Sequence, residues 1–164
     1  GLEDYSKDVP PQQNDTLLKL EMAQTETSYR NFLKSYFPSW QPAYEQFVEI
    51  YVRMQKGPDY PAYARTSVLT YQMIAEKPVV SDLPQLKMPV LLVIGQKDRT
   101  VFGRRFAPPE AVKTLGNFPE LGQKAQAAIP NAKLVPIENV GHVPHVEVPD
   151  QFVKIVVEFL NSKS

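Results

Sequence analysis

The stretch that decides the fold is Lys87-Met-Pro-Val-Leu-Leu-Val-Ile-Gly-Gln-Lys-Asp98-Arg-Thr100. It contains a short, continuous apolar run rich in β-branched residues, 90–94, bounded by Pro89 and Gly95. Such a run is typical of a strand in a parallel sheet that is buried on both faces. Asp98 would then lie in the loop just beyond the carboxyl end of the strand, where open α/β sheets bind their ligands.

The composition excludes several classes of protein. The 164 residues include 18 basic and 18 acidic side chains, so neither nucleic acid nor an anionic membrane is indicated as a partner. No apolar run approaches the roughly 20 residues of a membrane span, and the first residues do not resemble a signal peptide. Cysteine is absent, which excludes thiol catalysis and thiolate metal sites. We expect a soluble protein, and the compartment, whether cytoplasmic, periplasmic or secreted, is left undetermined.

The first half of the chain is predicted to be helical. Residues 1–14 are polar and loop-like, with Asp15 or Thr16 as the N-cap of the helix that follows and Asp59 as a later N-cap. The apolar spacing predicts three helices, over about 15–35, 41–55 and 60–76. No strand separates them, which favours a helical layer, residues 15–80, distinct from the sheet.

The second half is predicted to alternate strands and helices after a linker at 81–84. The expected order is strand 90–94, helix 118–128, strand 133–137 and a last helix that opens at Pro149. Pro136 cannot donate to a ladder, which places the second strand at or near a sheet edge. A sheet of two strands alone is only marginally stable, and an exposed apolar edge strand promotes aggregation. We therefore expect further strands from a second polypeptide or from a removed N-terminal part.

Asp98 and His142 are the candidate chemical pair. Each follows a predicted strand, and parallel strands about 4.8 Å apart bring the two loops to the same edge of the sheet. A carboxylate bonded to one imidazole nitrogen fixes the tautomer and leaves the other nitrogen free to accept a proton. His145 is the alternative base, and Asp82 and Glu138 are the alternative acids.

The pattern from Pro89 to Gly95-x-x-Asp98, with Gly141-His142 and then Glu147-x-Pro149, resembles the C-terminal portion of the α/β-hydrolase superfamily. The resemblance implies two parallel strands with flanking helices, Asp98 as the triad acid and His142 as the base. It further implies that 1–14 is the loop leaving a core strand, 15–80 a helical cap and 81–164 the C-terminal part of the core. No cofactor and no metal ion is implied.

The G-x-S-x-G nucleophile elbow of that superfamily is absent, as is the oxyanion-hole segment. We therefore expect this chain to be inactive alone and its partner to be the N-terminal half of the same hydrolase, carrying the nucleophile. Some side chains could line the pocket for a small-molecule substrate, although aromatic stripes at helical spacing usually form core. The substrate-pocket candidates are Tyr36, Trp40, Tyr44, Tyr63, Val101 and Val143. An anionic substrate could instead meet Arg99, Arg104 and Arg105, if these do not belong to a solvated loop.

Three functions remain open at this point. The leading hypothesis is hydrolysis of an ester or a similar small, largely apolar molecule through a nucleophile, histidine and aspartate triad. A second is an epoxide hydrolase or haloalkane dehalogenase with an Asp nucleophile, in which His142 activates the water. A third is a non-catalytic ligand-binding or receptor member of the fold.

Overall fold

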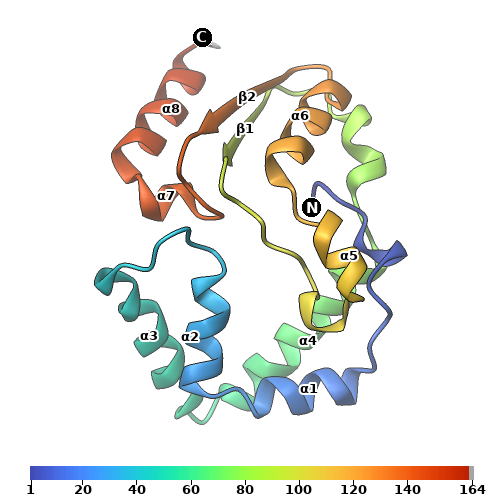
Figure 1. Ribbon diagram of the computed structural model, residues 1–164, viewed down its shortest axis with the longest axis vertical. Coiled ribbons are helices and arrows are strands. Elements are labelled where there is room, and N and C mark those ends of the chain that lie inside the picture. Colours follow the sequence, from blue (N-terminus) through green and yellow to red (C-terminus); the bar gives the residue numbers. More distant parts are fainter. Residues whose placement is uncertain (163–164) are drawn as a thin grey trace.

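The computed structural model describes residues 1–162. Figure 1 shows a helical region at one end of the molecule and an α/β region at the other. The helical region contains α1 (Asn14–Met22), α2 (Glu26–Lys34), α3 (Glu45–Gln55) and α4 (Tyr60–Glu76). The α/β region contains β1 (Val90–Gly95), α5 (Pro109–Thr114), α6 (Phe118–Ala128), β2 (Ala132–Ile137), α7 (Pro144–Glu147) and α8 (Pro149–Asn161).

The two strands form a parallel pair, as predicted from their composition and from the helix between them. Val90 lies opposite Ala132 and Gly95 opposite Ile137. Helices α6 and α8 lie on opposite sides of this pair (Figure 1). Gly122 of α6 lets that helix approach closely, since a Cβ there would lie only 3.0 Å from Cγ1 of Ile94. The α/β fold class is therefore confirmed.

The apolar strand is only half covered by the described part of the chain. Every side chain from Val90 to Ile94 is half-buried, although the sequence predicts burial on both faces. Helix α8 is strongly amphipathic, yet none of its residues is buried within residues 1–162. Its outward apolar side chains include Val153, Val157 and Leu160. The sheet formed by residues 1–162 has two strands.

The predicted first helix, 15–35, is wrong in two respects. The chain forms two helices there, because the Thr25 side chain accepts from Ser28 N–H while the Ser28 hydroxyl accepts from Thr25 N–H. This reciprocal capping box starts α2 at Glu26 and breaks the run. The first helix begins one residue earlier than predicted, after Gln13, so neither Asp15 nor Thr16 is its N-cap.

Other boundaries also differ from the prediction. Asp59 is at the N-cap position of α4, but its side chain makes no capping hydrogen bond. The stretches predicted as loops contain 3-10 turns, and residues 109–114 form a short helix that the sequence did not indicate. These turns are η1 (Tyr5–Lys7), η3 (Val80–Gln85) and η4 (Arg104–Phe106). A fourth 3-10 turn, η2 (Pro42–Tyr44), occupies the start of the predicted helix 41–55, so α3 begins only at Glu45.

The helical region is held together by a buried network of hydroxyl groups. The Tyr51 hydroxyl donates to Glu21 Oε1 at 2.9 Å and lies 2.8 Å from the Tyr60 hydroxyl, which donates to the Glu21 carbonyl at 3.0 Å. These bonds join the end of α1 to α3 and α4, and the ring of Tyr29 from α2 stacks on that of Tyr51 at 3.7 Å. Across residues 1–162, none of the helices has both the length and the apolarity that crossing a membrane requires.

Candidate active site

The loops that follow β1 and β2 are fastened to each other by backbone hydrogen bonds. Gln96 N–H donates to the Ile137 carbonyl at 2.9 Å, and Lys97 N–H donates to the Val140 carbonyl at 2.8 Å. The two loops can approach this closely only because residue 95 is a glycine. A Cβ at Gly95 would overlap the Gly141 carbonyl oxygen. The parallel pairing thus continues beyond the strands and fixes the two loops side by side.

Asp98 is the only buried carboxylate in the described part of the chain, with 5% of its surface exposed. Its Oδ1 accepts from the backbone N–H and from the hydroxyl of Thr100, each at 2.9 Å. Its Oδ2 lies 2.8 Å from His142 Nδ1. The contact predicted between Asp98 and His142 is therefore present, and each carboxylate oxygen has a partner.

The loop that carries His142 contains a tight turn and is held by two hydrogen bonds. It turns at Asn139, which has a φ of 60°, a conformation that Asn tolerates better than most residues. Gly141 N–H donates to Glu147 Oε1 at 2.8 Å, and His142 N–H donates to the carbonyl of Tyr36 at 2.8 Å. Burial raises the pKa of the Glu147 carboxyl above its ordinary value, because desolvation outweighs the backbone hydrogen bonds that it accepts.

Two aromatic rings border the imidazole. The ring of Tyr36 meets it edge-on at a centroid distance of 4.7 Å, and the ring of Phe118 does so at 5.6 Å. Burial, and then the negative charge of Asp98, raises the pKa of the Tyr36 hydroxyl. About a third of the His142 side chain (34%) remains exposed. The result is an oriented imidazole at an accessible edge of the sheet, next to apolar rings.

Solved structures share this arrangement of elements. The chain has 34% identity and a TM-score of 0.92 with a probable hydrolytic enzyme from Pseudomonas aeruginosa PAO1, covering 98% of this chain and 52% of that one. It has 22% identity and a TM-score of 0.51 with an α/β-hydrolase enzyme, MGS-M2, from a Medee basin deep-sea metagenome, covering 90% and 49%. The chain carries the C-terminal portion of an α/β-hydrolase fold.

A further match is the enol-lactonase from Burkholderia xenovorans LB400, with 18% identity and a TM-score of 0.55, covering 90% of this chain and 49% of that one. The chain thus spans about half the length of the solved structures it matches. No protein-family model matches the sequence, and the search of curated proteins returns no match.

Of the predicted pocket residues in this α/β-hydrolase portion, the structure brings Tyr36 against His142. Trp40 and Tyr44 pack together on Phe37, and the Trp40 indole N–H donates to Glu45 Oε1 at 3.0 Å. Trp40 and Tyr44 thus belong to a packed aromatic cluster, and in the described part of the chain neither ring forms an aromatic contact with His142.

The remaining pocket candidates lie in different parts of the molecule. The ring of Tyr63 stacks on that of Tyr60, and its side chain is largely exposed. Val101 packs against the small core formed by Tyr5, Val9 and Leu115. Val143 is the N-cap residue of α7, directly after His142.

The alternative acid and base residues lie away from the pair. His145 is exposed on α7, with its ring against Phe152 at 5.8 Å. The exposed Asp82 accepts only a long bond, 3.4 Å, from Gln85. Glu138 is exposed in the turn after β2. These placements favour the Asp98–His142 pair.

The arginines that could have met an anionic substrate are exposed, as expected for a solvated loop. Arg99 is also occupied, since its Nη1 donates to the carbonyl of Asp98 at 2.6 Å. Within residues 1–162, no group of three or more His, Asp or Glu side chains is arranged to hold a metal ion.

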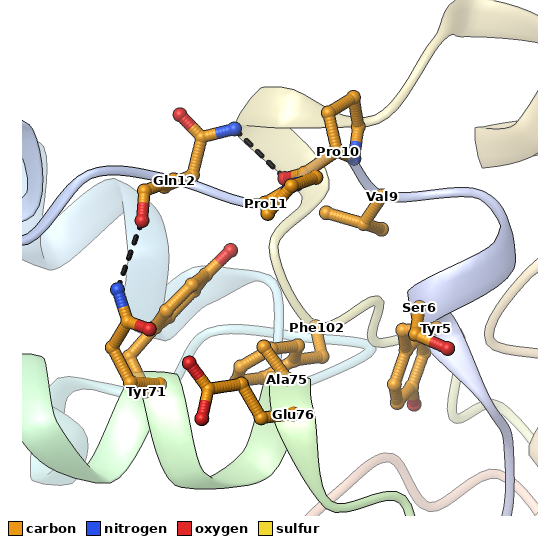
Figure 2. A pocket seen from close by; sticks show the side chains of 11 residues that line it. Tyr5, Ser6, Val9, Pro10, Pro11, Gln12, Tyr71, Ala75, Glu76 and Phe102 are labelled. Atoms are coloured by element: carbon orange, nitrogen blue, oxygen red, sulfur yellow. Dashed lines mark hydrogen bonds between the residues drawn. The ribbon is translucent and has the colours of Figure 1, made fainter.

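The cavity drawn in Figure 2 is separate from the Asp98–His142 pair. It has a volume of about 240 Å³ and lies between the N-terminal segment, α4 and the loop that carries Phe102. In Figure 2, Tyr71, Ala75 and Phe102 face Pro10 and Pro11 across it. Neither Asp98 nor His142 lines this cavity.

Three residues at the site were not assigned a role from sequence. Thr100 follows Asp98 by two positions, and the Asp-x-Thr spacing is itself a signal, because Asp side chains bond the backbone two residues ahead. Glu147 was noticed only as part of a motif. Phe118 opens α6 and carries no local signal for its contact with His142.

Proposed function

We propose that this chain supplies the acid and the histidine of a nucleophile–His–Asp triad in an α/β-fold hydrolase that cleaves esters. The observation that carries the proposal is the 2.8 Å contact between His142 Nδ1 and the buried Asp98 Oδ2. With Nδ1–H donating to the carboxylate, Nε2 of the neutral ring is a free base. The general hydrolase assignment agrees with the hydrolytic enzymes that share the fold.

The nucleophile in this proposal belongs to the N-terminal half of the same hydrolase, together with the oxyanion hole. The nucleophilic hydroxyl attacks the ester carbonyl while His142 Nε2 accepts its proton, and the imidazolium then protonates the departing alkoxide. Water next attacks the acyl-enzyme, giving its proton to the same nitrogen, and the proton returns to the nucleophile as the acid leaves. Asp98 stabilises the imidazolium in both steps.

The substrate class is inferred from what surrounds His142. The rings of Tyr36 and Phe118 border the imidazole, and the half-exposed ring of Phe32 lies 5.1 Å from that of Tyr36. A small, largely apolar acyl or alcohol group fits such a border better than an anion does. In this proposal, helices α1–α4 act as the cap that covers the pocket.

The test measures hydrolysis of a chromogenic short-chain ester by this chain joined to the polypeptide that carries the nucleophile. We expect turnover by the assembly, none by this chain alone, and loss of turnover in His142→Ala with a melting temperature within a few degrees of the wild type. His145→Ala is the matched control, because His145 is exposed and three residues away. Wild-type rates in His142→Ala, or lost activity in His145→Ala, would refute the assignment.

The same assembly separates the other hypotheses. Turnover of an epoxide or a haloalkane, with an Asp nucleophile in the partner, would support the epoxide hydrolase or haloalkane dehalogenase hypothesis, in which an alkyl-enzyme forms. Tight binding of a small molecule without turnover of any ester, epoxide or halide would favour the receptor.

A further inference from the structure

Thr100 touches both members of the Asp98–His142 pair. Its backbone N–H and its hydroxyl each lie 2.9 Å from Asp98 Oδ1, and its hydroxyl oxygen lies 3.0 Å from His142 Nδ1. His142 Nδ1 in turn lies 2.8 Å from Asp98 Oδ2. One threonine hydroxyl therefore closes a ring of three hydrogen-bonding groups.

The geometry allows one assignment of the protons. An ionised carboxylate only accepts, so the single hydroxyl proton of Thr100 belongs on the bond to Asp98 Oδ1. The hydroxyl oxygen then faces His142 Nδ1 with a lone pair, as Asp98 Oδ2 does. Two acceptors around one ring nitrogen require that nitrogen to carry the proton. Thr100 and Asp98 together thus select the tautomer in which Nε2 is unprotonated.

We propose that Thr100 is a positioning residue of the hydrolytic site, a role that rests on the proposed function. Its two donors hold Asp98 Oδ1, which fixes the rotation of the carboxylate and aims Oδ2 at the imidazole. Its oxygen also lies beside the positive charge that develops on His142 when Nε2 accepts a proton. Thr100 acts through these two residues and has no contact with the substrate.

The test replaces the hydroxyl by a methyl group of similar size. In the complete assembly, Thr100→Val should lower kcat for the chromogenic ester about tenfold, the rate equivalent of one hydrogen bond to a charged group. KM should stay unchanged, since the lost interaction strengthens only as charge develops. Thr100→Ser keeps both donors and should restore kcat to within about twofold of the wild type. Thr114→Val is the control, because that exposed hydroxyl only bonds to the Ala111 carbonyl.

A second measurement does not depend on turnover. In proton NMR spectra of the assembly, the Nδ1–H of His142 should give a low-field resonance in the wild type and in Thr100→Ser. In Thr100→Val, and in Thr100→Ala should the valine variant not fold, this resonance should move upfield and broaden through faster exchange with water.

The proposal is overturned if Thr100→Val keeps wild-type kcat, if Thr100→Ser is as slow as Thr100→Val, or if the Nδ1–H resonance is the same in all variants. A wild-type assembly without ester turnover would instead refute the proposed function, and the NMR comparison would then decide the role of Thr100.

Discussion

Replacing Asp98 by Asn should disable the histidine by reversing its tautomer. Both donors of Thr100 point at Oδ1 of Asp98, and one of them is a backbone N–H that cannot turn away. In Asp98→Asn the amide carbonyl must therefore take the Oδ1 position, which puts the amide NH₂ at Oδ2, 2.8 Å from His142 Nδ1. Nδ1 must then accept a hydrogen bond, and the proton moves to Nε2.

The expected loss of kcat in Asp98→Asn follows from the reversed tautomer of His142. With a proton on Nε2, the ring cannot act as the base in the first step, and the corresponding change in a Ser-His-Asp triad lowers kcat about 10⁴-fold. That loss corresponds to about 5.5 kcal/mol of transition-state stabilisation. KM should change little, because the carboxylate is buried and does not reach the substrate.

The assay is steady-state hydrolysis of the chromogenic ester by the complete assembly, with circular dichroism as the check on folding. Asp82→Asn is the matched control, since Asp82 is exposed and forms only a 3.4 Å contact with Gln85. A folded Asp98→Asn assembly that retains kcat within tenfold of the wild type would refute the tautomer argument. An equal loss in Asp82→Asn would refute the choice of Asp98 as the acid.

Three further predictions concern the surroundings of the pair. Gly141→Ala should lower kcat/KM about 100-fold where Gly57→Ala does not, because a Cβ at 141 overlaps the Tyr36 carbonyl oxygen and displaces the histidine loop. Glu147→Gln should melt at or above the wild-type temperature at pH 7, and the difference should vanish near pH 4, because burial raises the Glu147 pKa and the wild type loses stability as pH rises through it. A Glu147→Gln variant that melts below the wild type at pH 7 would contradict this. Tyr5→Phe should remove part of the stability loss between pH 10 and about 12 in thermal melts, since burial raises the Tyr5 pKa to about 12; identical alkaline melting curves would count against it.

The parallel pair and the meeting of Asp98 with His142 were predictable because both follow from local pattern. A short β-branched run ends at Gly95, and a second such run precedes Gly141-His142, so the two loops share one edge of the sheet. The bounds of β1, α6 and β2 and the start of α8 agree with the prediction to within a residue, whereas the short helices α5 and α7 were not predicted.

The contacts between distant segments were not predictable from periodicity. The Tyr36 carbonyl accepts from His142 N–H across 106 positions of sequence (142 minus 36), and the ring of Phe118 reaches the imidazole from the start of α6. Apolar spacing predicts that such aromatic side chains are buried, but it does not predict which residues they contact. The break before α2 was missed for a different reason, since a capping box with Ser in place of Glu at its fourth position is a weak signal.

The hydrogen bond from His142 N–H to the Tyr36 carbonyl also constrains how the molecule can move. Tyr36 lies two residues beyond the end of α2, so this bond ties the helical region to the loop that holds the base. Lifting α2 as a rigid body would break that bond and withdraw the Tyr36 ring from the imidazole in the same motion. We therefore expect the position of the His142 loop to depend on that of α2, because a shift of one displaces the other.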